Sequence, residues 1–104
     1  MHYLLNSPVL TAYGQYVFEA IALTEAKEWA KNSFISAIGH AATAELLSVL
    51  LEVEVSVNRV RIEMEMGDEA LVFRLLTRME EGRVFSREEI AQLPFEFGLL
   101  KKQG

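Results

Sequence analysis

The chain has 104 residues, of which 51% are hydrophobic and 24% charged, and its formal net charge is −5. A domain of this length buries roughly 65% of its unfolded surface, so we expect one domain with one core across residues 1–104. Cysteine is absent, which excludes disulfides, thiolate metal sites and a cysteine nucleophile, and which fits a reducing interior. With only two histidines and one aspartate, we expect neither a metal ion nor a cofactor.

The charge and hydropathy patterns also limit the partners. An acidic protein lacks the many cationic contacts that give proteins their affinity for duplex DNA, so we expect no DNA partner. No apolar run approaches the ~20 residues of a membrane span, and Met1–Pro8 lacks the basic region of a signal peptide. We therefore expect a soluble, cytoplasmic protein with no membrane partner.

The start of the chain predicts two strands and a helix. Tyr3–Leu5 is typical of a short strand that stops before Pro8, whose nitrogen cannot donate a hydrogen bond. Tyr16–Ile21 has an alternation of side chains that favours a second strand. Thr24 is a candidate N-cap for a helix over Glu25–Lys31, since the acidic start and basic end of that segment suit the helix dipole.

The segment around Gly39 predicts a strand, a sharp turn and a second helix. Ser33–Ala37 favours a strand, and Gly39 marks a change of direction. From about His40 to Leu51 the pattern is helical, with Glu45 as the only charge. Because apolar residues surround most of this helix, we expect the sheet to cover one side of it and a second subunit to cover another.

The second half predicts mostly strands. Arg59–Met66 alternates, with its even-numbered apolar residues pointing inward, and Ala70–Arg78 is apolar on both parities, as in a central strand. Gly67-Asp68 turns the chain between them. A capping box, Ser86-Arg87-Glu88-Glu89, opens a short helix, and Phe95–Leu100 follows as an edge strand or a tail. The expected fold is a compact α/β or α+β domain with two or three helices on a mixed β-sheet.

The turn at Gly39 carries the first candidate site. A helix N-terminus offers free backbone N–H groups and a favourable dipole to an anion. His40 stands at such a terminus, where its imidazole could donate a proton to an anionic substrate. Gly39 and His40 are therefore candidate ligand-binding and catalytic residues. The alternative is that His40 only caps or packs against the start of the helix.

The distribution of cations gives a second signal. All arginines lie between residues 59 and 87, and all lysines lie outside that range. Since a guanidinium group can bind two phosphate oxygens at once, this segregation hints at phosphate recognition, with a solvated charged face as the alternative. Arg74 shares its parity with Val72 on an otherwise apolar strand, so it needs a partner or a ligand. Arg78 and Glu81 follow at the end of this strand, where by themselves they are typical of a solvated turn.

Four short blocks, taken together, resemble a known family. They are Tyr3–Ser7, Ser36–Thr43 with its Ile-Gly-His, Asn58–Val60, and Arg78-x-x-Glu81-Gly82, in this order and at this spacing. The blocks resemble the small viral and prophage proteins identified as ring nucleases, which are anti-CRISPR proteins acting on type III systems. The resemblance covers essentially the whole chain.

This resemblance implies a homodimeric α/β protein that binds cyclic tetra-adenylate across the dimer and cleaves it without a metal ion, in the host cytoplasm if the protein is viral. The residues that it assigns to catalysis are His40, Arg78 and Glu81, and those that it assigns to ligand contact are Asn6, Arg59 and Arg74. Some family members have glutamine in place of Arg74, and some have serine in place of Val9.

Two other functions remain as alternatives at this point. The protein could sequester the cyclic nucleotide without cutting it, although the presence of His40 argues against that function. It could also be a viral DNA-binding or interaction protein, although its acidity and the absence of a basic helix argue against DNA binding.

Overall fold

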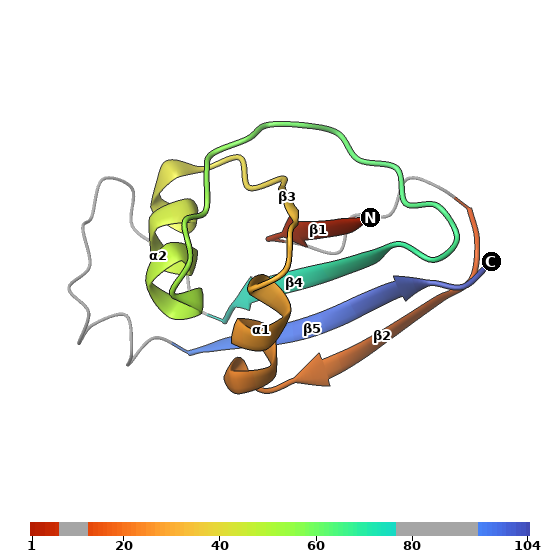
Figure 1. Cartoon of the computed structure of the whole chain (residues 1–104), viewed down its shortest axis with the longest axis horizontal. Coiled ribbons are helices and arrows are strands. Elements are labelled where there is room, and N and C mark those ends of the chain that lie inside the picture. Colours follow the sequence, from red (N-terminus) through yellow and green to blue (C-terminus); the bar gives the residue numbers. More distant parts are fainter. Residues whose placement is uncertain (7–12, 77–93) are drawn as a thin grey trace.

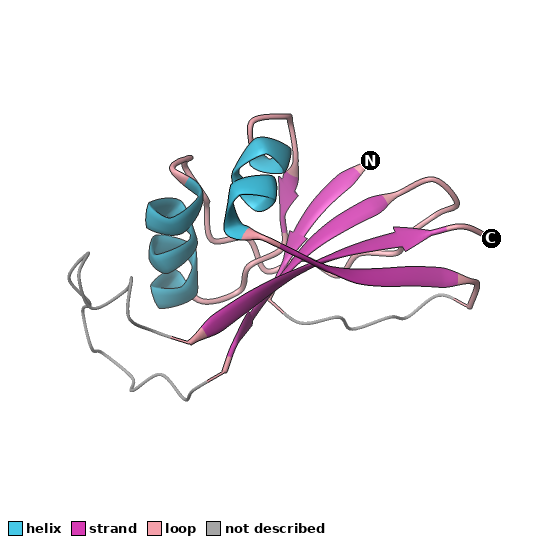
Figure 2. Ribbon diagram, turned by 90° about the horizontal axis from the view of Figure 1, so that it is seen from below, coloured by secondary structure: helices cyan, strands magenta, loops and turns pink. Residues whose placement is uncertain are grey.

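Five strands form one mixed sheet, and two helices lie on one of its faces (Figures 1 and 2). The computed structural model describes residues 1–6, 13–76 and 94–104. In chain order the elements are β1 (His2–Leu5), β2 (Tyr16–Ile21), α1 (Leu23–Ala30), β3 (Ile35–Ser36), α2 (Ala41–Leu51), β4 (Glu69–Leu75) and β5 (Phe95–Lys102). The expected α+β class is thereby confirmed. The helix expected from Ser86 lies outside the described residues.

The strand order in the sheet is β2–β5–β4–β1–β3. β1 pairs in parallel with both β3 and β4, whereas β5 pairs antiparallel with β4 and β2. The carboxyl ends of β1, β3 and β4 therefore meet at one edge of the sheet. β5 lies inside the sheet, so the prediction of an edge strand or tail for Phe95–Leu100 is wrong. Phe97 and Leu100 belong to the cores on opposite faces, and a strand buried on both faces belongs between neighbours.

The larger core lies between the sheet and the two helices (Figure 2). The buried residues of α2 are Ala44, Leu46, Leu47, Leu50 and Leu51. Val49, at 36% exposure, is the only large hydrophobic side chain of this helix that is exposed. The helix is thus covered within one chain, by the sheet, by α1 and by Val55 of the following segment. The apolar surface of α2 is therefore buried without a second subunit, and it gives no support to the expected homodimer.

Part of the segment between α2 and β4 packs on the opposite face of the sheet. Ile62 and Met64 contribute to the smaller core there. This segment is extended, but it contains no strand, so the strand predicted at Arg59–Met66 is wrong, and Val60 and Met66 are exposed. An alternating pattern indicates that one side of an extended chain is buried. Here that side rests on the face of the sheet, where Ile62 and Met64 join the smaller core.

The start of α1 also differs from the prediction. The helix begins at Leu23, with Ala22 and not Thr24 as its N-cap. The carboxylate of Glu25 accepts a hydrogen bond from the Ala22 N–H at 3.3 Å. This contact from the third helical residue back to the N-cap replaces a capping side chain. The helix therefore starts two residues before the start that Thr24 predicted.

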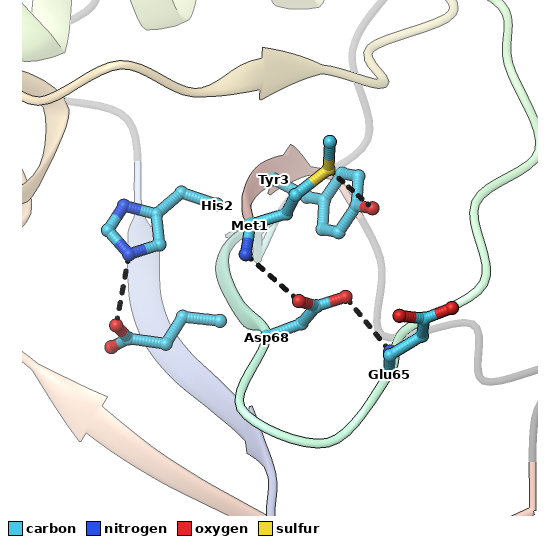
Figure 3. Close-up of polar contacts among 6 residues, drawn as sticks. Met1, His2, Tyr3, Glu65 and Asp68 are labelled. Atoms are coloured by element: carbon cyan, nitrogen blue, oxygen red, sulfur yellow. Dashed lines mark hydrogen bonds and ion pairs between the residues drawn. The ribbon is translucent and has the colours of Figure 1, made fainter.

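A polar cluster joins the first residue of the chain to the turn before β4 (Figure 3). The carboxylate of Asp68 accepts hydrogen bonds from the α-ammonium of Met1 and from the Glu65 N–H, both at 2.9 Å. Burial alone would raise the pKa of the Asp68 carboxyl. The two hydrogen bonds, the Met1 ammonium and the charge of Lys102 outweigh burial and hold that pKa below its ordinary value. The predicted turn is confirmed here, with Gly67 at a φ of 94°.

Candidate functional site

The carboxyl ends of the parallel strands bring two separate segments to one edge of the sheet. Asn6 follows β1, and residues 37–40 connect β3 to α2. β3 itself is held in place by the backbone hydrogen bond from Ala37 N–H to Leu4 O at 2.9 Å. In open sheets with parallel strands, ligands bind outside the carboxyl ends of the strands. This edge is therefore the natural place to look for a site.

An open cleft with a volume of about 440 Å³ lies at this edge. Its lining residues are Asn6, Ala37, Gly39, His40, Arg59 and Val60. Four of the residues singled out from the sequence, Asn6, Gly39, His40 and Arg59, thus lie around one cleft, although they are spread over more than half of the chain. Ala37 and Val60 were not singled out, because apolar residues give no chemical signal in a sequence.

His40 is the N-cap of α2, and its side chain is exposed. Its imidazole makes no capping hydrogen bond, and only its backbone carbonyl takes part in the helix, accepting the Ala44 N–H at 3.0 Å. The first turn of α2 carries no acidic residue. The imidazole of His40 therefore does not cap the helix by a hydrogen bond, and among the described residues both the exposed imidazole and the positive end of the helix dipole face the cleft where an anion could bind.

Arg59 reaches the cleft from the long segment before β4. Its Nε donates a hydrogen bond to the carbonyl oxygen of Gly39 at 2.8 Å. Within the described ranges, no other hydrogen bond or ion pair of this guanidinium is seen. A Cβ on Gly39 would lie 3.3 Å from Cγ of Arg59, so the absence of a side chain at Gly39 lets the arginine lie close to the turn. The remaining N–H groups of Arg59 can bind an anion in the cleft.

Asn58 fixes the backbone from which Arg59 projects. Its side-chain amide donates to Ser36 O at 2.7 Å, and its backbone N–H donates to Ile38 O at 2.8 Å. Ser36 in turn donates from its hydroxyl to Ser56 O at 2.7 Å. Sequence reasoning noticed Asn58 only as part of a block and assigned it no role. Its signal is weak because an asparagine beside an arginine has many possible uses.

Arg74 does not belong to this cleft. It projects from β4 on the face opposite the helices, and its guanidinium pairs with the carboxylate of Glu96 on β5 at 2.9 Å. The expectation that Arg74 needs a partner is confirmed, and that partner is Glu96. Arg78 and Glu81 follow the end of β4 in the sequence and lie outside the described residues. In the described part of the chain, no three histidine, aspartate or glutamate residues gather closely enough to hold a metal ion. No helix there is long and apolar enough to cross a membrane.

Comparison with known proteins gives relatives along almost the whole chain. A protein of Sulfolobus islandicus filamentous virus, named uncharacterized protein 26, is 42% identical over 97% of this chain and 91% of its own length. Uncharacterized protein ORF117 of Acidianus two-tailed virus is 36% identical over 96% of this chain and 92% of its own. The Bacillus subtilis protein YddF is 33% identical over 94% of both chains.

A solved structure has the same fold. The structure of B116 of Sulfolobus turreted icosahedral virus superposes with a TM-score of 0.79, covers 96% of this chain and 97% of its own, and is 24% identical. The sequence model of the STIV B116-like family matches residues 2–97. The relatives come from viruses and from a bacterium, and the viral ones agree with the resemblance to viral proteins. The family model over residues 2–97, together with the relatives that are 33–42% identical along almost the whole chain, shows that the chain belongs to the STIV B116-like family.

Proposed function

We propose that this protein is a ring nuclease, which binds cyclic tetra-adenylate at a dimer interface and cleaves it to linear di-adenylate with a 2′,3′-cyclic phosphate. In this proposal the reaction needs no metal ion and shuts off type III CRISPR signalling. The observation that carries the proposal is the cleft in which the exposed His40, whose imidazole makes no capping hydrogen bond, lies with Arg59, Asn6 and the N-terminus of α2. A proton donor next to an anion-binding surface is what phosphodiester cleavage requires.

The proposed reaction uses the nucleophile of the substrate itself. The 2′-oxygen of a ribose attacks the adjacent phosphorus, and the bond from phosphorus to the 5′-oxygen breaks. The 2′-hydroxyl proton goes to solvent, and His40 gives a proton to the departing 5′-oxygen. The products are a 2′,3′-cyclic phosphate and a 5′-hydroxyl, so water is not consumed. General acid catalysis of this kind contributes about 10²–10⁴-fold to the rate.

The remaining roles follow from charge. The N-terminus of α2 and the free N–H groups of Arg59 stabilise the phosphate before and during the reaction. The family resemblance adds Arg78 and Glu81 as a supporting arginine and glutamate. In this proposal Arg78 stabilises the charge on the reacting phosphate, and Glu81 orients either Arg78 or His40. Asn6 lines the cleft at the end of β1 and can donate or accept a hydrogen bond at the ribose or phosphate.

The proposal includes a two-fold homodimer with the ring on its axis. Each chain has a single His40, whereas a ring with four equivalent phosphates gives two-residue products. A two-fold axis through the ring places one His40 at each of two opposite phosphates, so two cuts give two identical halves. It also doubles the number of arginines around the ligand, which lets an acidic protein hold a tetra-anion.

The direct test is incubation with cyclic tetra-adenylate in excess EDTA, followed by chromatography of the products. We expect linear di-adenylate with a 2′,3′-cyclic phosphate. Intact ring bound to the protein would identify a protein that only sequesters the nucleotide. Loss of activity on chelation, with recovery on adding a divalent ion, would show that the metal-free mechanism is wrong.

The two histidines provide a matched pair of variants for this assay. His40→Ala should reduce the cleavage rate at least ~100-fold while the ring still binds. His2→Ala should leave the rate unchanged, because His2 pairs with Glu69 at 3.1 Å at the start of β1, at the other end of that strand from Asn6. Equal rates for wild type and His40→Ala would exclude His40 as the acid.

A further inference from the structure

Ser36 is a buried polar residue next to the cleft, and it has no role in the function proposed above. Its exposed fraction is 7%, and it ends β3 just before the connection that carries Gly39 and His40. A hydroxyl group that is buried without hydrogen bonds costs free energy. The Ser36 hydroxyl avoids this cost, because it donates to the Ser56 carbonyl oxygen at 2.7 Å and accepts the Ile38 N–H at 3.3 Å. It therefore links the start of this connection to a segment 20 residues further along the chain.

The two hydrogen bonds of this hydroxyl differ in strength. An O–H donor commonly lies about 2.7–2.8 Å from its acceptor, so the bond to Ser56 has an ordinary length. An N–H donor commonly lies within about 3.2 Å of its acceptor, so the bond from Ile38 is long. Removal of the hydroxyl therefore affects the segment at Ser56 more than the turn at Ile38.

The segment at residues 56–59 depends on isolated hydrogen bonds of this kind. It lies beside residues 36–39 and runs in the same direction, but it forms no strand. Two hydrogen bonds from Asn58 and one from Arg59 also join it to residues 36–39. Because these contacts do not form a continuous ladder, the loss of one of them lets the backbone shift locally.

Two serines hold consecutive residues at the start of this segment. The Ser48 hydroxyl on α2 accepts the Val55 N–H at 3.0 Å and donates to the Ala44 carbonyl oxygen of its own helix at 2.8 Å. Val55 is also buried in the larger core, so packing fixes its position as well. The next residue, Ser56, is exposed and is held by Ser36. The Ser36 contact is thus the one that directs the chain from the core towards the cleft.

Arg59 comes three residues after Ser56, and its guanidinium has little freedom at the turn. Nε of Arg59 donates to the Gly39 carbonyl oxygen at 2.8 Å, and its Cγ lies 3.3 Å from the place of a Cβ on Gly39. In the proposed function its other N–H groups bind the phosphate whose leaving oxygen His40 protonates. Such donors stabilise charge well only when they are already in place. A shift of about 1 Å can reduce the rate by about 100-fold.

We propose that Ser36 is a positioning residue of the cleft, an inference that rests on the proposed function. Its hydroxyl fixes the carbonyl of Ser56, and the short chain from Ser56 to Arg59 then holds the guanidinium against Gly39, where it meets the phosphate. Ser36 touches no substrate and acts through Arg59. It is not among the residues to which the family resemblance assigns a role.

A double-mutant cycle with Arg59→Ala tests this route, with single-turnover kinetics at excess protein so that slow variants stay measurable. Ser36→Ala should lower kcat/KM for cyclic tetra-adenylate at least about fivefold. In the Arg59→Ala background the same change should lower it less than about twofold, because the group through which Ser36 acts is gone. A variant that lost activity only through unfolding would show the same factor in both backgrounds. Equal factors, or no loss in the wild-type background, would overturn the inference.

Ser48→Ala is the matched control. It also removes one donated and one accepted hydrogen bond of a serine that holds this segment, so its melting temperature should fall about as far as that of Ser36→Ala. Its kcat/KM should stay within about twofold of wild type. A loss of activity equal to that of Ser36→Ala would show a general loosening of the segment, and would contradict a specific role for Ser36.

The Nε–H signal of Arg59 in ¹⁵N NMR gives a readout that does not depend on activity. The hydrogen bond to Gly39 should slow the exchange of this proton with water in the wild type. Ser36→Ala should speed the exchange at least about tenfold, and Ser48→Ala should leave it unchanged. If the wild type neither binds nor cleaves cyclic tetra-adenylate, the proposed function fails, and this measurement still decides. Faster exchange in Ser36→Ala alone would then support the placement of Arg59 by Ser36, and unchanged exchange would overturn it.

Discussion

Replacement of Gly98 by alanine tests the packing between β2 and β5 directly. The new Cβ would lie 2.3 Å from Cε1 and 2.6 Å from Cζ of Phe18, so the ring must retreat by about 1 Å to reach ordinary contact at 3.4 Å or more. The free-energy cost of this clash has an upper limit, because the Phe18 ring can rotate away from the sheet into solvent. Full burial of a phenylalanine stabilises by about 1.5–3 kcal/mol. For a side chain that is 43% exposed, release costs about 1–1.5 kcal/mol.

The substitution also stabilises the strand, because glycine inside a strand destabilises the fold by about 0.5–1 kcal/mol relative to alanine. We therefore expect Gly98→Ala to lower the free energy of unfolding by about 0.5 kcal/mol in the wild type. In a Phe18→Ala background the clash is absent, and the same change should raise that free energy by about 0.5–1 kcal/mol. The coupling between the two sites is then about 1–1.5 kcal/mol.

Urea unfolding of the four proteins, followed by circular dichroism, measures this coupling. The m-values should agree, which would show that the unfolded and folded states are unchanged in compactness. Additive effects within about 0.3 kcal/mol would mean that the two side chains do not touch. In that case the ring of Phe18 does not lie over Gly98.

Three further substitutions probe the core, the cleft and the polar cluster. Leu71→Ala removes a fully buried side chain and should destabilise by about 2–5 kcal/mol in urea unfolding; a cost below about 1 kcal/mol would contradict its place in the core. Asn58→Ala loses the side-chain hydrogen bond to Ser36, and should cost about 1 kcal/mol and also slow cleavage of cyclic tetra-adenylate; unchanged cleavage would show that Asn58 does not position Arg59. Asp68→Asn should cost about 1–2 kcal/mol at pH 7. The pKa of the Asp68 carboxyl is lower in the folded than in the unfolded protein. The extra stability of the wild type is therefore fully present above the unfolded pKa of about 3.9, and it is lost as pH falls through the folded pKa. Melting curves should therefore separate the two proteins at pH 7 and approach one another as pH falls below the unfolded pKa of about 3.9, and a separation that does not shrink with falling pH would refute the assignment.

Local patterns predicted most of the elements. The alternation at residues 16–21 and the apolar run at the start of α2 correspond directly to β2 and α2. The errors have a common physical origin. A pattern in one segment reports which side of it is buried, but not whether a neighbouring strand lies beside it. Residues 59–66 alternate and rest on the sheet, and residues 95–100 were taken for an edge or tail although β4 and β2 flank them.

The candidate site was predictable to a different extent for each residue. His40 and Gly39 could be found from a glycine turn that precedes a helix, because that chemistry is local. Arg59 was found through its cation and the family resemblance, but its contact with Gly39 joins segments 20 residues apart and needs the fold. Arg74 could be seen to need a partner, but Glu96 is set by the register between β4 and β5, which the sequence of neither strand specifies.

The place of β1 between β4 and β3 in the sheet has a consequence for how the chain folds. This strand comes early in the chain, yet its parallel partner β4 begins only at Glu69, which pairs with His2. At ~5–20 residues per second of synthesis, β1 waits roughly 3–13 s for that partner. During this interval the backbone of β1 lacks its hydrogen-bonding partner β4. The side chains of Leu4 and Leu5, both buried in the finished sheet, then stay exposed to solvent. We therefore expect slow folding dominated by non-local pairing, and a nascent chain whose first strand is a binding site for chaperones.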